Sequence, residues 1–179
     1  DYLVVESTYG NRAHTAVSVK DQLEGMLQRT FAKGGVLLVP AFAVGRTQEL
    51  VYSLHQLFRA GKIPGIPIYV DSPLAIDATQ VFRLHPDLFD RSENMIETTT
   101  RLFDFPLAHY TRDVLESKKL NSMAGPAIII AASGMAESGR IVHHLANGLG
   151  NHRNLVLFVG FQGENTLGRR IQEGAKTAK

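Results

Sequence analysis

The residue types that bind anions gather where an apolar run of the sequence passes into a helical pattern. Ser133 and Gly134 follow the apolar run of residues 127–131, and Gly139 and Arg140 open the helix that is expected next. A glycine lets a ligand approach the backbone closely, a hydroxyl group donates a hydrogen bond, and a guanidinium group pairs with phosphate. This spacing therefore favours contact with a phosphate group.

Four more apolar runs are followed by residues of the same kinds. These residues are Glu6, Ser7, Thr8, Tyr9 and Gly10; Gly45 and Arg46; Asp71 and Ser72; and Gly160, Gly163 and Glu164. In a parallel sheet the carboxyl ends of the strands lie at one edge, and the helices that start there direct N–H groups and positive dipole ends at the same crevice. One such loop is more often only a tight turn or a helix cap. Five loops at one edge favour an anion-binding rim.

Five short apolar runs are expected to form the strands that position these loops. The runs are Tyr2–Val5, Val36–Val39, Ile66–Val70, Ala127–Ala131 and Leu155–Val159. Each is continuously apolar, which is typical of strands covered on both faces. Helical periodicity separates most of the runs, while residues 86–113 show no clean period and are expected to hold short helices or a surface excursion. The sequence predicts an α/β fold, with a mostly parallel sheet sandwiched by helices in a Rossmann-like three-layer domain.

Composition narrows the class of protein. The 179 residues are 44% apolar, carry a net charge of +2 and include no cysteine. This excludes disulfides and thiolate metal sites and favours a cytoplasmic protein. No apolar run approaches the roughly 20 residues that a membrane span requires. The near-neutral charge gives no global field for nucleic acid, although arginines beside turns leave a local basic cleft open. Because strand-like residues follow Asp1 at once, we expect a piece excised from a larger protein.

Common catalytic motifs do not account for these loops. The sequence contains neither a P-loop nor a G-x-G-x-x-G after its first apolar run, and Ser133 does not lie in G-x-S-x-G. His143 and His144 are adjacent on an expected helix and point about 100° apart, so they are not expected to share a metal. The remaining histidines are dispersed. The sequence therefore predicts no metal site within this chain.

Five segments resemble successive signatures of the β-CASP domain, which is inserted into nucleases of the metallo-β-lactamase fold. They read "LVVESTYGNRAH", "VLLVPAFAVGRTQELVYSL", "IPIYVDSPLA", "IIIAASGMAESGRIVHHL" and "LVLFVGFQGENTLGRRI". The resemblance covers nearly the whole chain, in the family's order, and weakens between about 85 and 120. The chain is most similar to the bacterial and archaeal RNA-processing branch, whose relatives include the endonuclease subunit of the cleavage and polyadenylation factor.

The resemblance implies roles for individual residues. Glu6 matches the motif A acid, which pairs with a histidine that would lie outside this chain. The residues expected to bind RNA or phosphate are Ser7, Thr8, Tyr9, Arg46, Asp71, Ser72, Ser133, Gly134, Gly139, Arg140, Gly163 and Thr166. Two zinc ions are implied for the parent enzyme, and their ligands belong to the metallo-β-lactamase domain, none of whose motifs occurs here. The resemblance thus implies that residues 1–179 are the RNA-binding lid of a zinc-dependent ribonuclease and are inactive alone. Its partners would be single-stranded RNA and its own metallo-β-lactamase domain, with no membrane.

Two other interpretations stay open at this stage. One is a stand-alone module that binds nucleotides or phosphate, and the other is a structural domain that forms homodimers. Leu102, Phe103, Phe105 and Leu107 offer an apolar partner surface for the second, although core packing is the commoner fate of such residues. Whether the parent is an endonuclease or a 5′ exonuclease, and which RNA it acts on, also stays open.

Overall fold

A parallel five-stranded sheet forms the centre of the protein. The computed structural model describes residues 1–11, 13, 18–88 and 102–177. The strands are β1 (Val36–Pro40), β2 (Ile68–Val70), β3 (Ala108–Tyr110), β4 (Ala127–Ala131) and β5 (Leu155–Val156). Their order is β3-β2-β4-β1-β5, and every pairing is parallel. The predicted parallel sheet is confirmed.

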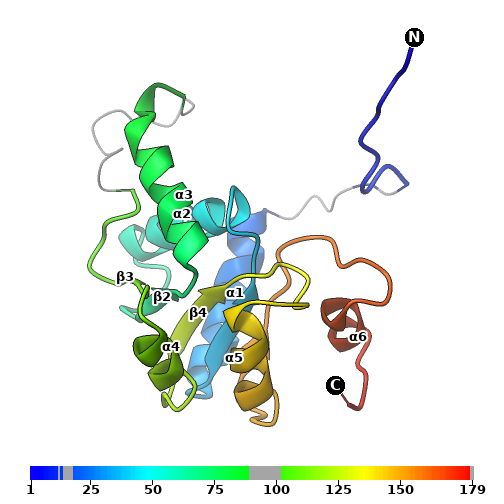
Figure 1. Cartoon of the computed structure of the whole chain (residues 1–179). Coiled ribbons are helices and arrows are strands. Elements are labelled where there is room, and N and C mark those ends of the chain that lie inside the picture. The colour runs from blue at the N-terminus through cyan, green and yellow to red at the C-terminus, as the bar shows by residue number, and fades with distance from the viewer. Residues whose placement is uncertain (12, 14–17, 89–101, 178–179) are drawn as a thin grey trace.

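Helices cover both faces of the sheet and give the three layers that the sequence predicts (Figure 1). They are α1 (Val19–Ala32), α2 (Arg46–Arg59), α3 (Pro73–Leu84), α4 (Val114–Leu120), α5 (Arg140–Gly148) and α6 (Leu167–Gln172), with a 3-10 turn at Pro86–Leu88. One core lies between the sheet and α1, α2 and α3. A second, smaller core lies between the sheet and α4, α5 and α6.

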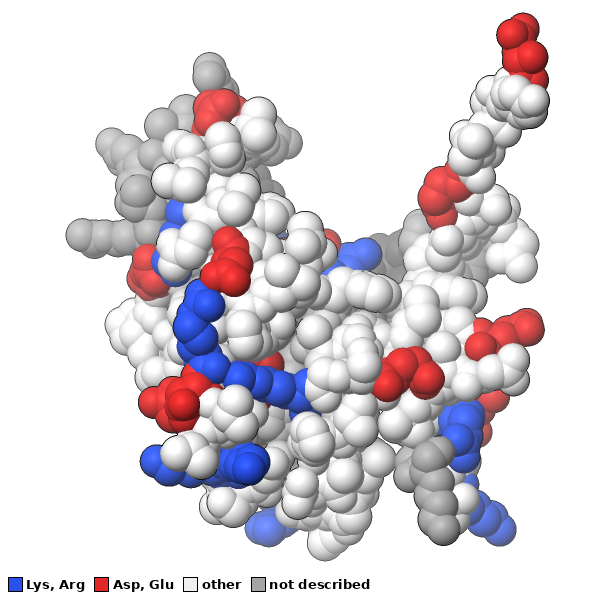
Figure 2. Space-filling view, in the orientation of Figure 1, with Lys and Arg blue, Asp and Glu red and all other residues white. Residues whose placement is uncertain are grey.

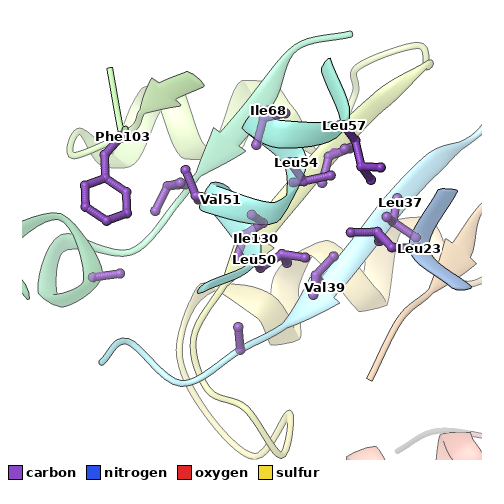
Figure 3. Close-up of a cluster of buried hydrophobic side chains, with 14 of the residues drawn as sticks. Leu23, Leu37, Val39, Leu50, Val51, Leu54, Leu57, Ile68, Phe103 and Ile130 are labelled. Carbon is purple, nitrogen blue, oxygen red and sulfur yellow. The ribbon is translucent and has the colours of Figure 1, made fainter. Parts of the chain in front are cut away.

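Alternate side chains of the central strands enter the two cores. Leu37 and Val39 of β1 and Ile130 of β4 point toward Leu50 and Leu54 of α2, as Figure 3 shows. The alternating residues of the same two strands, such as Leu38 and Ile129, enter the opposite core. All five residues of each of these strands are buried. This burial on both faces is the reason that their sequences are continuously apolar.

The expected strand Tyr2–Val5 is wrong for this structure. Its four side chains are between 68% and 103% exposed, and the segment forms no strand and extends away from the domain (Figure 1). A strand needs a partner for its backbone N–H and C=O groups. Within the described residues, no neighbouring strand supplies one.

Other elements differ from expectation because their sequences carry weak signals. β5 is shorter than predicted, and α3, α4 and β3 lie where no element was assigned. β3 is a half-exposed edge strand with His109 at its centre, so it has no apolar run. Residues 89–101, part of the expected surface excursion, lie outside the described residues. Leu102, Phe103 and Phe105 are buried in the larger core and Leu107 packs against it, so they do not form an exposed partner surface.

Candidate functional site

The loop after β4, residues 132–139, is at the centre of the sheet's carboxyl edge. Ser133 Oγ accepts hydrogen bonds from the backbone N–H groups of Glu137 (3.1 Å) and Ser138 (3.3 Å). Gly139 precedes α5 with φ of 76°, and a Cβ there would lie 2.3 Å from the Ala132 carbonyl oxygen. This conformation and this space both require glycine. The loop therefore has a fixed shape, which Ser133 and Gly139 maintain.

Asp71 and Arg140, two of the predicted phosphate ligands, are paired with each other. Arg140 Nη1 donates to Asp71 Oδ1 at 2.6 Å and to the Thr111 carbonyl at 3.0 Å, and Nη2 donates to the Arg112 carbonyl at 2.8 Å. Asp71 is fully buried, and the Arg140 side chain is only 18% exposed. The guanidinium of Arg140 therefore joins β2, the segment after β3, and α5. Its contact with RNA stays a prediction.

Two further side chains complete the bonding of the Asp71 carboxylate. Ser117 Oγ donates to Oδ2 at 2.6 Å, and His144 Nε2 donates to the same oxygen at 2.7 Å. His144 Nδ1 lies 2.7 Å from Asn121 Oδ1. Burial raises the pKa of Asp71, but the hydrogen bonds from His144, Ser117 and Arg140, with the charge of Arg140, outweigh burial and hold this pKa below its usual value. We call Asp71, Ser117, Arg140 and His144 the buried ionic cluster.

Ser72 and Thr166 serve as helix caps. Ser72 Oγ accepts from the Ala75 N–H at the start of α3, and the residue is buried. Thr166 Oγ1 accepts from the Arg169 N–H at the start of α6 and donates to the Gly163 carbonyl at 2.7 Å. Both hydroxyls satisfy helix termini, which is the ordinary role of Ser and Thr after a strand.

Arg46 is an exposed cation at the carboxyl edge. It begins α2 directly after Gly45, whose φ is 79°. Its side chain is 45% exposed and pairs with Glu49, which is 58% exposed, at 2.7 Å. An exposed pair of this kind is worth less than about 1 kcal/mol, so an incoming phosphate can replace Glu49 at little cost.

Three polar side chains that the sequence reasoning did not assign hold these loops together. Thr47 Oγ1 donates to the Phe42 carbonyl at 2.7 Å. Gln48 Nε2 donates to the carbonyl oxygens of Ala43 and Ala75 and to Thr79 Oγ1, and so ties α2 to α3. Gln162 Nε2 donates to the Gly134 carbonyl at 3.0 Å. The sequence marks these residues only by their position, since Thr47 and Gln48 follow Arg46 and Gln162 precedes Gly163. A sequence does not indicate which group a side-chain amide will bond to.

The predicted acid Glu6 is not brought to this group. Residues 1–7 form an extended arm that projects from the body (Figure 1). Glu6 Oε1 accepts from the Thr8 N–H at 2.5 Å, and hydrogen bonds from Thr8 lower the pKa of this carboxyl. Tyr9 packs edge-on against Phe161, with ring centroids 5.8 Å apart, and links the base of the arm to the loop before α6. The structure thus brings Asp71, Arg140 and the loops of Ser133 and Gly163 together, but leaves Glu6, Ser7 and Thr8 on the arm.

Charged side chains of both signs are mixed on the surface of the described part of the chain. Figure 2 shows acidic and basic side chains interspersed among large uncharged areas on one face. Among the described residues, no group of three or more histidine, aspartate or glutamate side chains is placed to hold a metal ion. Nor does this part of the chain contain a helix long and apolar enough to cross a membrane.

Comparison with known proteins places this geometry in context. The profile of the Beta-Casp domain matches residues 47–171. Ribonuclease TTHA0252 of Thermus thermophilus is 37% identical over 177 residues, which are 96% of this chain and 40% of that protein. An RNase J-like protein of Methanocaldococcus jannaschii is 34% identical over 98% of this chain and 41% of its own length. Transcription termination factor FttA of Methanosarcina mazei is 32% identical over 97% of this chain and 28% of its own length. The chain therefore spans less than half of each of these relatives.

Proposed function

Because the chain belongs to the Beta-Casp domain family, we propose that it is the RNA-binding domain of a metal-dependent ribonuclease that hydrolyses RNA phosphodiester bonds. The observation that carries this proposal is the set of interlocked loops at the carboxyl edge, with Arg46 exposed among them. The names of two relatives, a ribonuclease and an RNase J-like protein, support RNA as the substrate class.

Arg46 and the backbone around it are suited to hold a phosphate of single-stranded RNA. The Arg46 guanidinium donates two hydrogen bonds to a phosphate in a geometry that lysine does not reproduce. It lies at the start of the 14-residue helix α2, where the helix dipole adds to the attraction. The Arg140 guanidinium, in contrast, keeps the loops in place through Asp71. We therefore assign the phosphate contact to Arg46 and a positioning role to Arg140.

The hydrolytic chemistry is proposed to come from a metallo-β-lactamase domain in the whole protein. The described residues do not offer a metal site, so the two zinc ions expected for the parent enzyme would be held by that domain. The arm supports this arrangement, because consecutive exposed apolar residues at 2–5 fit a surface that a partner covers. Glu6, on the same arm, would then reach the reaction centre in the whole protein. We propose that the 179-residue chain alone does not hydrolyse RNA.

Binding of a single-stranded RNA oligonucleotide, measured by fluorescence anisotropy at several salt concentrations, tests the RNA-binding role. We expect binding at low salt that weakens as salt rises, since each phosphate contact contributes a slope of about −0.7 in log K against log salt. Arg46→Ala should lower affinity and make the slope shallower by about this amount. Arg153→Ala, at the opposite edge of the sheet, is the control and should change neither quantity.

Three results would contradict the proposal. Absence of RNA binding at low salt would end the RNA-binding role, and tight binding of mononucleotides instead would favour a nucleotide-binding module. An Arg46→Ala variant that binds with unchanged affinity and slope would remove Arg46 from the interface. RNA cleavage by the chain in zinc, lost on Glu6→Gln, would show that the chain is active alone.

A further inference from the structure

On the described body of the protein, the phenylalanine and tyrosine rings that are exposed lie at the carboxyl edge. Phe42 after β1 and Phe161 after β5 are exposed at this edge, and Tyr2 is exposed on the arm. Phe42 is 47% and Phe161 is 42% exposed. The other described phenylalanine and tyrosine rings are buried or half-buried, so the core does not explain the exposure of Phe42 and Phe161.

Phe42 is held by the loop after β4. An added Cβ at Gly134 would lie 2.7 Å from Cδ2 and 2.8 Å from Cε2 of the Phe42 ring, so the ring rests directly against the Gly134 backbone. The Phe42 carbonyl accepts the hydrogen bond from Thr47 Oγ1, which fixes the main chain below the ring. The absent side chain at Gly134 thus lets the ring contact the loop closely, while the residue stays 47% exposed.

Phe161 is attached to the same loop by its neighbour. Gln162 Nε2 donates to the carbonyls of Gly134, Gly160 and Phe161, at 3.0, 3.1 and 3.2 Å. The Tyr9 ring meets the Phe161 ring edge-on and supports it from one side. Both exposed rings therefore lie next to Gly134: Phe42 contacts it directly, and Phe161 is linked to it through the hydrogen bond that its neighbour Gln162 donates to the Gly134 carbonyl.

We propose that Phe42 and Phe161 are stacking platforms for unpaired bases of the nucleic acid bound at this edge, an inference that rests on the proposed function. A base has two apolar faces and stacks on a phenylalanine ring whatever its sequence. Arg46, four residues beyond Phe42, supplies the phosphate contact beside that ring. Ser133, the neighbour of Gly134, and Arg46, four residues after Phe42, place polar groups in the same loops as the rings, which suits a ligand with both bases and phosphates.

The platforms would make the protein select single-stranded nucleic acid. Bases of a duplex already stack on one another, so a ring at the protein surface gains nothing from them. Base stacking on aromatic side chains also discriminates weakly between sequences. The expected specificity is therefore for unpaired strands of any sequence rather than for a particular motif.

The test compares two ligands of equal charge: an oligoadenylate of about twelve nucleotides and an abasic oligonucleotide of the same length, at low salt. We expect the wild-type chain to bind the oligoadenylate more tightly, and Phe42→Leu and Phe161→Leu each to reduce only that affinity, by about fivefold to a hundredfold. Binding of the abasic strand should stay constant, because the phosphate contacts remain. A duplex of the same length should respond to the variants as the abasic strand does.

Two further variants separate stacking from loss of structure. Gly134→Ala retains both rings but places a methyl group where the Phe42 ring lies, so it should weaken oligoadenylate binding like Phe42→Leu. Leu149→Ala removes a similarly exposed apolar side chain (39%) at the far end of α5 and should change nothing. Circular dichroism and urea midpoints verify that each variant is folded.

The outcomes distinguish this inference from the proposed function. If wild type binds both strands equally, or if the phenylalanine variants weaken both strands by the same factor, stacking is refuted while RNA binding stands. If neither strand binds, the proposed function fails and the platforms fail with it. If the variants change sedimentation but leave the oligoadenylate affinity intact, the rings contact protein, which also overturns the inference.

Discussion

Removal of the Asp71 carboxylate should be among the most damaging single changes in this protein. Asp71→Asn keeps the shape of the side chain but replaces one acceptor oxygen with an amide that donates. Three donors, from Ser117, Arg140 and His144, converge on the buried carboxylate at 2.6 to 2.7 Å. Loss of one partner from a buried ion pair costs about 3–5 kcal/mol, because the remaining charge is left without compensation. We therefore expect the free energy of unfolding to fall by about 4 kcal/mol.

Urea unfolding followed by circular dichroism measures this loss. With a dependence on urea of about 2 kcal/mol per molar, the midpoint should fall by about 2 M. Asp77→Asn is the matched control, since Asp77 pairs with Arg112 while both side chains are more than half exposed. Its effect should stay within about 0.5 kcal/mol. A loss below about 1 kcal/mol for Asp71→Asn would refute the view that this cluster holds the carboxyl edge together.

The same cluster predicts a pH dependence. The pKa of Asp71 is lower in the folded protein than in the unfolded chain, so the unfolded chain takes up the proton first as pH falls. The contribution of Asp71 to stability is complete above the unfolded pKa of about 4 and is lost as pH falls through the folded value. The difference in unfolding free energy between wild type and Asp71→Asn should accordingly shrink below about pH 4.

Three further changes test the core, the loop after β4 and a buried histidine. Ile130→Ala leaves a cavity at a fully buried position of the central strand and should lower the free energy of unfolding in urea by about 2–5 kcal/mol. A loss below about 1 kcal/mol would contradict the assigned core. Gly139→Ala should lower the melting temperature, because φ is 76° and the new methyl group meets the Ala132 carbonyl at 2.3 Å; an unchanged value would refute this strained geometry. Burial lowers the pKa of His55, so the unfolded chain binds a proton there at higher pH, and stability should fall from about pH 7 toward about pH 5. His55→Phe, which retains a ring against Phe105, should weaken that fall in urea midpoints measured at both pH values, and an identical fall in the variant would exclude His55 as its source.

The central strands could be predicted because their burial leaves a mark on the sequence. β1 and β4 are covered on both faces, and a continuous apolar run is the direct consequence. Residues 2–5 show the same apolar pattern but form no strand. The prediction failed there because an apolar pattern does not identify which surface covers the side chains. β3 shows the reverse: its backbone pairs with β2, while its half-exposed residues carry no apolar signal.

The position of the loops could be predicted, but their internal bonding could not. The glycines, hydroxyls and arginines after four of the five predicted strands marked the carboxyl edge, since parallel strands bring these loops together. The partner of Arg140, however, is a carboxylate 69 positions earlier in the chain, and no local rule relates the two. His144 was not expected to bind a metal and was given no other role, yet its Nε2 completes the bonding of Asp71. Sequence spacing therefore located the loops, but only the folded geometry distinguishes the exposed Arg46 from the internal Arg140.

The strand order has a consequence for the synthesis of the protein. β1 and β2 follow each other in the chain but do not touch in the sheet, because β4 lies between them and pairs with both. Until residue 131 has left the ribosome, the only pair of the described strands that can form is the three-residue contact of β2 with β3. A pair this short is not stable by itself. The apolar faces of α1 and α2 must therefore remain without their sheet until β4 has been synthesised, and chaperones would matter most during that period.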